Sequence, residues 1–131
     1  MPLGAAYYVA FQEIEDDPRT ELIVAIRNDH LVGTLQLTVL PNITYQGARR
    51  GQIEGVRVRH DLRGTGIGVD LVKHAIQRSL ARDCRIVQLT TDKTRPSAIG
   101  FYEQLGFRAT HEGMKLWLDQ EPSGYSPGQT A

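Results

Sequence analysis

The chain has 131 residues, of which 40% are hydrophobic and 23% are charged. This length and composition are typical of one soluble globular domain with a sizeable core. Fifteen basic residues balance fifteen acidic ones. Because nucleic acids and membrane surfaces attract excess positive charge, a neutral chain argues against both as partners and favours a small molecule.

The single cysteine, Cys84, excludes an intrachain disulfide, so nothing in the sequence points to an oxidising compartment. The N-terminus lacks the pattern of a secretion signal, and no apolar run approaches the roughly 20 residues that span a bilayer. The sequence therefore predicts a cytoplasmic protein without membrane association. Cys84 has no adjacent base and is interpreted as a buried apolar group. The histidines are scattered, so no metal is expected.

The first predicted elements are a helix and an antiparallel hairpin. Apolar side chains recur at helical spacing from Ala5 to Glu15, and Asp16-Asp17-Pro18 ends that segment. Glu21 to Arg27 and Leu31 to Leu40 are predicted strands, joined by a turn at Asn28-Asp29-His30. Alternation along the second strand places these residues on one face: Leu31, Gly33, Leu35, Leu37 and Val39.

A third strand is predicted from Gln52 to Val58, after a surface loop over Pro41 to Gly51. Its apolar parity breaks, because Ile53 is at an odd position whereas Val56 and Val58 are at even ones. A β-bulge near Glu54-Gly55 accounts for this change. Such a bulge bends the strand away from its neighbour and leaves an unpaired edge.

A helix follows and ends near Arg82. Its predicted buried face is Leu71, Val72, Ala75, Ile76, Ser79 and Leu80. Ile86 to Thr91 is a predicted strand, buried on both faces and parallel to the previous one, with a right-handed crossover. The last helix is expected to begin at Pro96 and to end before Gly106 in a left-handed cap. Phe107 to Leu118 is predicted to be a strand pair turning at Glu112-Gly113.

Gly64, Gly66 and Gly68 stand at a helix start, where bare backbone N–H groups favour phosphate binding. Their spacing fits neither the dinucleotide fingerprint nor a P-loop. The run Arg63-Gly64-Thr65-Gly66-Ile67-Gly68 is instead similar to the coenzyme A motif of the Gcn5-related N-acetyltransferase (GNAT) superfamily. Ala98-Ile99-Gly100-Phe101-Tyr102-Glu103-Gln104-Leu105-Gly106-Phe107 resembles the second motif of that family.

This resemblance implies an α/β GNAT fold, with a mixed, mostly antiparallel central sheet flanked by helices and a splayed V-shaped cofactor cleft. The family's usual first strand and helix have no counterpart before Ala5. One domain is expected over residues 1–119, with a disordered tail over residues 120–131. A homodimer that covers the open sheet edge, a more open groove and a misassigned translation start are alternative consequences of the shortened N-terminus.

The resemblance also implies acetyl-coenzyme A as the acyl donor. The pantetheine arm is expected on the backbone of Val56, Arg57 and Val58. The pyrophosphate is expected at the helix start formed by Arg63, Gly64, Thr65, Gly66, Ile67, Gly68 and Val69. Arg95 stands where many members of the family have an asparagine that holds the pantetheine, which weakens one cofactor contact.

For the chemistry, the resemblance implies that Tyr102 is the general acid that protonates the departing thiolate. Its other interpretation is a core aromatic residue. Glu54, on the bulged strand, is the candidate base, directly or through water, or a structural group at the bulge. His111 is a second candidate base.

The implied function is N-acetyltransfer to a primary amine, in a small molecule or a peptide, by direct attack in a ternary complex. The alternative is a noncatalytic module that binds or senses acyl-coenzyme A. An acidic cluster attracts a cationic amine or is simply a solvated helix end: Glu13, Glu15, Asp16 and Asp17.

Overall fold

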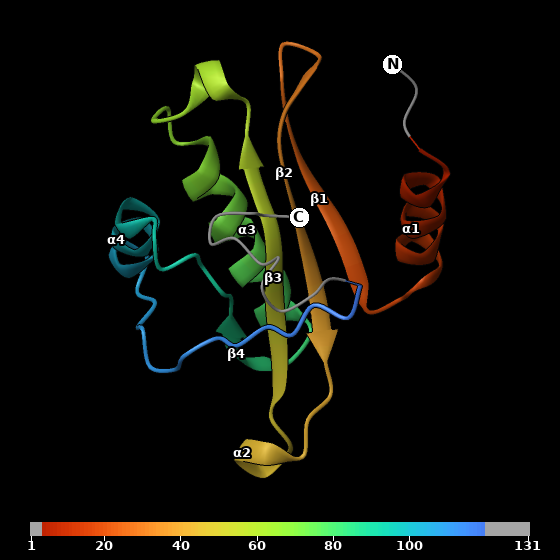
Figure 1. The fold of residues 1–131 in the computed structure, drawn as a ribbon, viewed down its shortest axis with the longest axis vertical. Coiled ribbons are helices and arrows are strands. Elements are labelled where there is room, and N and C mark those ends of the chain that lie inside the picture. The colour runs from red at the N-terminus through yellow and green to blue at the C-terminus, as the bar shows by residue number, and fades with distance from the viewer. Residues whose placement is uncertain (1–3, 120–131) are drawn as a thin grey trace. The chain divides into compact units, whose positions relative to one another are not determined.

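The computed structural model describes residues 4–119. The chain divides into two compact units, with the boundary between residues 89 and 90. The first unit contains a four-stranded sheet in the order β1-β2-β3-β4 (Figure 1). Strands β1, β2 and β3 are antiparallel, and β4 is parallel to β3. Its elements are α1 (Ala5–Asp16), β1 (Thr20–Arg27), β2 (His30–Leu40), α2 (Thr44–Gly47), β3 (Arg49–Val58), a 3₁₀ turn (His60–Leu62), α3 (Ile67–Ala81) and β4 (Cys84–Gln88). The mixed, mostly antiparallel sheet is confirmed.

The hairpin of β1 and β2 closes where Asn28 and Asp29 adopt φ values of +50° and +64°. These two residue types tolerate the left-handed region that a tight hairpin turn requires. Beyond the turn, Ala25 pairs with Gly33 but Ile26 pairs with Leu31, so Val32 is an extra residue in β2.

That extra residue corrects one prediction. Val32 is buried at 3% exposure, whereas Leu31 is 57% exposed. The prediction that Leu31 faces the core is therefore wrong, because a bulge reverses the facing of every residue on its far side. The remaining predicted positions of β2 are buried: Gly33, Leu35, Leu37 and Val39.

The core lies between α3 and one face of the sheet. The buried residues of α3 are Ile67, Leu71, Val72, Ala75 and Ser79. Leu80 was expected among them but is 66% exposed, so that prediction is wrong. Helix and sheet approach each other closely at Gly51, where a Cβ atom would collide with Ser79 Oγ. The hydroxyl of Ser79 is satisfied by donating to Ala75 O at 2.8 Å.

A half-buried ion cluster joins the C-terminal end of α3 to β1. Arg78 donates to both carboxylate oxygens of Glu21, at 2.9 and 2.8 Å, and Arg82 donates to one of them at 3.1 Å. The hydrogen bond from Arg78 lowers the pKa of Glu21 below its usual value, against the opposing effect of burial. This cluster fixes α3 across the edge strand.

Two strand boundaries differ from the sequence prediction. Strand β3 begins at Arg49 rather than Gln52, because Gly51 serves close packing against α3 rather than a loop. Strand β4 runs from Cys84 to Gln88 rather than from Ile86 to Thr91, and it is not buried on both faces, since Arg85 is exposed. Its parallel pairing with β3 is confirmed. Cys84 is buried, as expected, and burial raises the pKa of its thiol.

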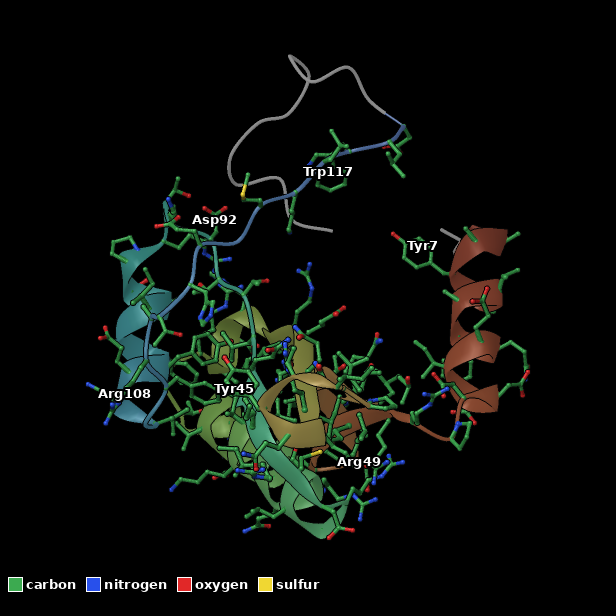
Figure 2. All side chains as sticks on the ribbon, turned by 90° about the horizontal axis from the view of Figure 1, so that it is seen from below. Tyr7, Tyr45, Arg49, Asp92, Arg108 and Trp117 are labelled. Atoms are coloured by element: carbon green, nitrogen blue, oxygen red, sulfur yellow. The ribbon has the colours of Figure 1, made fainter. Side chains whose placement is uncertain are left out.

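Helix α1 forms where periodicity predicts it, yet none of its residues is buried. Tyr7, Tyr8 and Val9 are 58–68% exposed. Figure 2 shows α1 standing apart from the sheet, with the Tyr7 side chain projecting from it. Within residues 4–119, no helix is long and apolar enough to cross a membrane.

The second unit contains α4 (Pro96–Gln104), which begins with proline in its first turn. Gly106 has a φ of +99°, which confirms the left-handed cap. The predicted strand pair over Phe107 to Leu118 is wrong, since no described residue of this segment forms a strand. Alternation alone does not make a strand without a hydrogen-bonded neighbour, and Met114, Leu116 and Leu118 are 77–94% exposed. The predicted tail lies outside the described residues.

Candidate functional site

The bulge predicted in β3 is present. Thr34 pairs with Arg57 and Gln36 pairs with Glu54, so two residues of β3, Gly55 and Val56, lie opposite one residue of β2. Gly55 has a φ of +63°, a conformation that glycine adopts at little cost. The bulge therefore turns Val56 and Val58 to the face that Ile53 occupies before it and leaves Glu54 on the opposite face.

Strand β3 loses its second neighbour close to the bulge. Its pairing with β4 ends at Gln52 and Gln88. From Ile53 to Val58 it is hydrogen-bonded to β2 on one side, and no described strand pairs with its other edge (Figure 1). Strand β4 ends at Gln88, so this part of β3 has a free edge, and an extended ligand with amide groups fits such an edge.

The hydrogen-bond pattern between β2 and β3 determines which backbone groups of β3 point to its free edge. Arg59 N donates to Val32 O at 2.8 Å. Because an antiparallel strand alternates the direction of its peptide groups, the backbone of Arg57 also points to β2, and that of Val58 points away from β2, to the free edge. Of the three predicted pantetheine ligands, Val58 thus presents its N–H and C=O at the free edge, while Val56 lies within the bulge.

The glycine turn follows β3 and leads into α3. Gly64 and Gly66 adopt φ values of +79° and +94°, and Gly66 is the N-cap of α3. Thr65 Oγ1 donates to Leu62 O and closes the turn. The first amides of α3 have no acceptor within the helix, so they are available to an anion. The side chain of Ile67 packs in the core, at 7% exposure, so only its amide is available.

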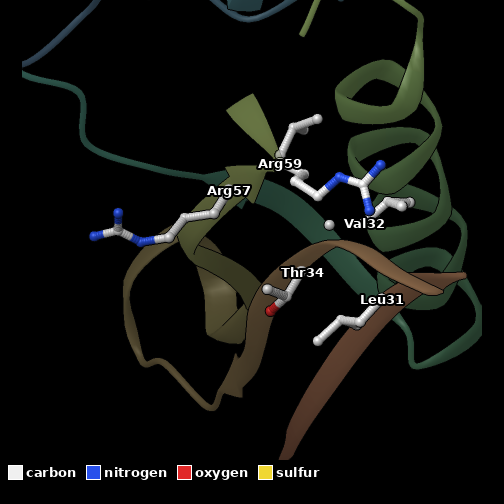
Figure 3. Close-up of a pocket in the computed structure, with 7 residues that line it drawn as sticks. Leu31, Val32, Thr34, Arg57 and Arg59 are labelled. Atoms are coloured by element: carbon white, nitrogen blue, oxygen red, sulfur yellow. The ribbon is translucent and has the colours of Figure 1, made fainter. Parts of the chain in front are cut away.

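Two arginines flank a shallow cavity between β2 and β3, shown in Figure 3. Its volume is about 310 Å³. Its lining residues are Leu31, Val32, Gly33, Thr34, Arg57, Val58 and Arg59. Arg59 donates to Asp61 at 2.7 and 3.1 Å, and this hydrogen bonding lowers the pKa of the Asp61 carboxyl. Arg59 is thus already paired with a carboxylate.

We call the face of the sheet opposite α3 the outer face. Glu54 lies on it, exposed, and its partner Gln36 lines a cavity of about 340 Å³ beneath α1. The other lining residues are Ala10, Glu13, Ile14, Asp17 and Thr20. Of the predicted acidic cluster, only Glu13 and Asp17 line this groove.

The carboxylate of Asp17 is held locally. It accepts hydrogen bonds from Arg19 N at 2.9 Å and Thr20 Oγ1 at 2.8 Å. The backbone bond from Arg19 is the main cause of its lowered pKa. The carboxylate of Glu13 is therefore the better candidate to attract a cation in the groove. In the sequence, Gln36 is marked only as a polar residue within the alternation of β2, and no motif includes it.

The two other candidate catalytic residues belong to the second unit. Tyr102 is half-buried, with its ring edge-to-face against Phe101 and Phe107 at centroid distances of 5.0 and 5.8 Å. Burial raises the pKa of its hydroxyl, and Arg95 opposes this shift. The hydroxyl is therefore a proton donor at neutral pH. His111 is exposed, and its Nδ1 lies 2.7 Å from Thr110 Oγ1.

Among residues 4–119, no three His, Cys, Asp or Glu side chains lie together as ligands of one metal ion would. Two features of the first unit suit a ligand with amide and phosphate groups, the strand edge beyond Gln52 and the amides at the start of α3. The strand edge offers N–H donors and C=O acceptors to amide groups, and the helix start offers N–H donors to a phosphate.

The chain matches known acetyltransferases. The family model described as "Acetyltransferase (GNAT) family" matches residues 2–107. Glucosamine 6-phosphate N-acetyltransferase of Trypanosoma brucei brucei is 35% identical over 89 residues, which are 67% of this chain and 58% of that protein. Human N-alpha-acetyltransferase 30 is 46% identical over 59 residues, 45% of this chain and 16% of that protein. The chain thus spans less than two thirds of these curated relatives.

Among solved structures, a protein of Bacillus halodurans C-125 named as a transcriptional regulator is 53% identical. The match has a TM-score of 0.87 and covers 89% of this chain and 78% of that one. The fold of this chain is therefore found in a solved structure of clear sequence similarity.

Proposed function

The chain belongs to the acetyltransferase (GNAT) family, and we propose that it transfers an acetyl group from acetyl-coenzyme A to a primary amine. The observation that carries this proposal is the edge of β3 that opens beyond Gln52, next to a glycine turn that leads into α3. This combination offers an amide-binding edge and a phosphate-binding helix start within one continuous run of sequence.

In the proposed complex the pantetheine amides add to the free edge of β3 at Val56 to Val58, with Val58 supplying the backbone groups that point away from β2. The pyrophosphate rests on the amides from Gly64 to Val69, and Arg63 adds side-chain charge. The positive end of the α3 dipole favours the same anion.

The proposed reaction is direct attack in a ternary complex. The nitrogen lone pair of the neutral amine forms a bond to the thioester carbonyl carbon, and the carbon–sulfur bond breaks. Glu54 accepts the proton that the amine loses, directly or through water, and Tyr102 donates its proton to the departing thiolate. The raised pKa of Tyr102 keeps that proton in place at neutral pH. His111 and water alone are the alternative bases.

We further propose that the acceptor, a small molecule or a peptide terminus, enters the groove between α1 and the outer face. Glu13 lines this groove, and Glu54 lies on the strand next to Gln36. The carboxylates of Glu13 and Glu54 would attract a cationic amine to this groove.

The test is thiol release from acetyl-coenzyme A with a panel of amines. The panel contains glucosamine 6-phosphate and a peptide with a free α-amine, which the relatives' names suggest, and 1,4-diaminobutane as a simple dication. We expect saturable thiol release with at least one amine. Coenzyme A binding without thiol release from any amine would contradict the transferase proposal.

That contradicting outcome would favour the second candidate function, a noncatalytic module that senses acyl-coenzyme A. The observation in its favour is the name of the 53% identical Bacillus halodurans protein, a transcriptional regulator. The thiol-release assay, together with a binding titration of coenzyme A, separates the two functions, because a sensor binds the cofactor with no turnover.

We also propose that a second copy of the chain pairs with the free edge of β1. This strand is at the edge of the sheet, and its outer-face residues Leu22, Val24 and Ile26 are 40–60% exposed. An edge strand without charge or proline in its centre favours association. Light scattering should give twice the monomer mass at micromolar concentration, and a monomer mass would contradict the dimer.

A further inference from the structure

A chain of hydrogen-bonded side chains crosses the outer face where β3 and β4 part. Arg50 Nη1 donates to Gln88 Oε1 at 3.2 Å, and Gln88 Nε2 donates to Gln52 Oε1 at 2.6 Å. Gln52 and Gln88 are the last residues that pair β3 with β4. The side-chain hydrogen bond between them therefore joins the two strands where their pairing ends.

The donor and acceptor roles of the two glutamine amides follow from the chemistry of arginine. A guanidinium has only donors, so the atom of Gln88 that meets Arg50 must be its oxygen. The amide nitrogen of Gln88 is then turned to Gln52, whose oxygen accepts it. The amide of Gln52 is left with its nitrogen, a donor, directed away from Gln88. No described residue accepts a hydrogen bond from Gln52 Nε2.

Arg50 itself is fixed on its other side. Its Nη2 donates to Thr44 Oγ1 at 2.8 Å, and Thr44 donates in turn to Asn42 Oδ1 at 2.6 Å. The guanidinium lies over the ring of Tyr45, 5.6 Å from its centroid, a cation–π arrangement. Tyr45 holds this place with a φ of +52°, which is unusual for an aromatic residue. The guanidinium is thus oriented by several independent contacts.

We propose that Arg50 is a positioning residue which, through Gln88, turns the amide of Gln52 so that its Nε2 donates a hydrogen bond to an oxygen atom of the amine substrate. Gln52 and Glu54 are two positions apart on the outer face, about 7 Å along a strand. The donor and the carboxylate then contact different atoms of one small acceptor. The substrate class is an amine that carries a hydroxyl, carbonyl or carboxylate oxygen near its nitrogen. This inference rests on the proposed function.

The decisive variant is Gln88→Glu. The new carboxylate still accepts from Arg50 but has no donor, so the Gln52 amide must rotate and donate its Nε2 to that carboxylate. Gln52 then presents its oxygen to the substrate. We expect the side-chain NH₂ of Gln52, followed by ¹⁵N NMR without any substrate, to exchange with solvent rapidly in the wild type and slowly in the variant.

Kinetics give the second readout, with whichever of glucosamine 6-phosphate and the α-amine peptide has the higher turnover, because both carry an oxygen atom near the amine. For Gln88→Glu we expect KM for the amine to rise about tenfold or more, since a donor is replaced by an acceptor facing the same oxygen. The affinity for coenzyme A should stay unchanged. Arg50→Lys should fall between wild type and Gln88→Glu, because an ammonium does not reproduce the fork that reaches both Thr44 and Gln88.

Gln77→Glu is the matched control, because Gln77 is exposed on α3 and undergoes the same chemical change. It should alter neither amide exchange nor KM. Rapid exchange of the Gln52 NH₂ in a folded Gln88→Glu protein would overturn the proposal that Arg50, through Gln88, orients the Gln52 amide. Slow exchange with an unchanged KM would overturn its role in substrate binding. If the wild type acetylates no amine of the panel, the proposed function fails, and the NMR result alone still decides the orientation of the amide.

Discussion

The two faces of the sheet use alternate residues of the same strands for different purposes. On the face that α3 covers, Leu35, Leu37 and Val39 are completely buried and Ile53 is 2% exposed. On the outer face, polar side chains occupy the intervening positions of β2 and β3: Thr34, Gln36, Gln52 and Glu54. Along each strand, the residues that stabilise the fold therefore alternate with the residues to which the chemistry is assigned.

The bulge at Gly55 is the point where this separation changes. It keeps Val56 and Val58 on the covered face. Strand β3 therefore continues to place apolar side chains against the core beyond Gln52, where its edge is no longer paired with β4. Substitutions on the covered face should therefore act on folding, and those on the outer face and at the cofactor edge should act on turnover or binding.

The largest effect is expected for Leu35→Ala on the covered face. Removing a fully buried leucine leaves a cavity and should lower the free energy of unfolding by about 2–5 kcal/mol. Leu31→Ala is the matched control on the same strand, because Leu31 is 57% exposed, and it should cost less than about 0.5 kcal/mol. Urea unfolding measures both, and equal losses would contradict the assignment of faces.

Glu54→Gln on the outer face should leave the unfolding midpoint unchanged and lower kcat about 100-fold, since general-base catalysis contributes at least that much in typical enzymes. Coenzyme A affinity should be retained. Glu15→Gln, on the exposed surface of α1, is the matched control. Unchanged turnover in Glu54→Gln would remove Glu54 from the mechanism and leave His111 or water as the base.

Tyr102→Phe extends the comparison to the second unit. The phenyl ring retains the packing against Phe101 and Phe107, so the melting temperature should change little. Without the hydroxyl, kcat should fall about 10- to 100-fold with coenzyme A affinity retained. Stopped-flow thiol release measures this step. Wild-type turnover in the variant would make Tyr102 a packing residue only.

Gly66→Val should weaken coenzyme A binding about tenfold or more, measured by titration calorimetry. Gly66 has a φ of +94°, which a β-branched residue rarely adopts, so the glycine turn must change shape. Gly106→Ala is the control for strain alone, because Gly106 has a similar φ of +99° outside this turn. It should lower stability without loss of affinity, and retained affinity in Gly66→Val would argue against the pyrophosphate assignment.

The smallest effect is expected for the ion cluster of Glu21. The pKa of the Glu21 carboxyl is lower in the folded state than its unfolded value near 4.5. The stabilising contribution of Glu21 is therefore fully present above the unfolded pKa and is lost as the pH falls through the folded pKa. Glu21→Gln should lower the melting temperature by a few degrees at pH 7, and this difference should shrink below pH 4.5. A difference that is independent of pH would show that packing, not charge, holds the cluster.

The sequence predicts the parts of this fold that local pattern determines. The parity change between Ile53 and Val56 locates the bulge, and the spacing of the glycines locates the start of α3. Leu31 shows where such patterns fail, because the bulge at Val32 depends on pairing with β1, which the alternation along β2 alone does not reveal. The strand pair over Phe107 to Leu118 fails for the reverse reason, since alternation is present without a paired neighbour.

The candidate site shows the same limit. The run from Glu54 to Val69 is continuous in sequence, so a motif finds it. The Gln52–Gln88 bond joins residues 36 positions apart, and Arg50 was assigned to a surface loop. Such a network depends on which residues of β3 and β4 are paired, and these parallel strands are joined by a long crossover rather than by a short turn that would fix the pairing.

The most direct test of the account is a map of backbone amide shifts during titration of the ¹⁵N-labelled protein with coenzyme A. We predict the largest changes at Val56 to Val58 and at Gly64 to Val69, with the amides of β1 unaffected. Large shifts elsewhere, with the edge of β3 and the glycine turn unchanged, would contradict the claim that this run holds the acyl donor.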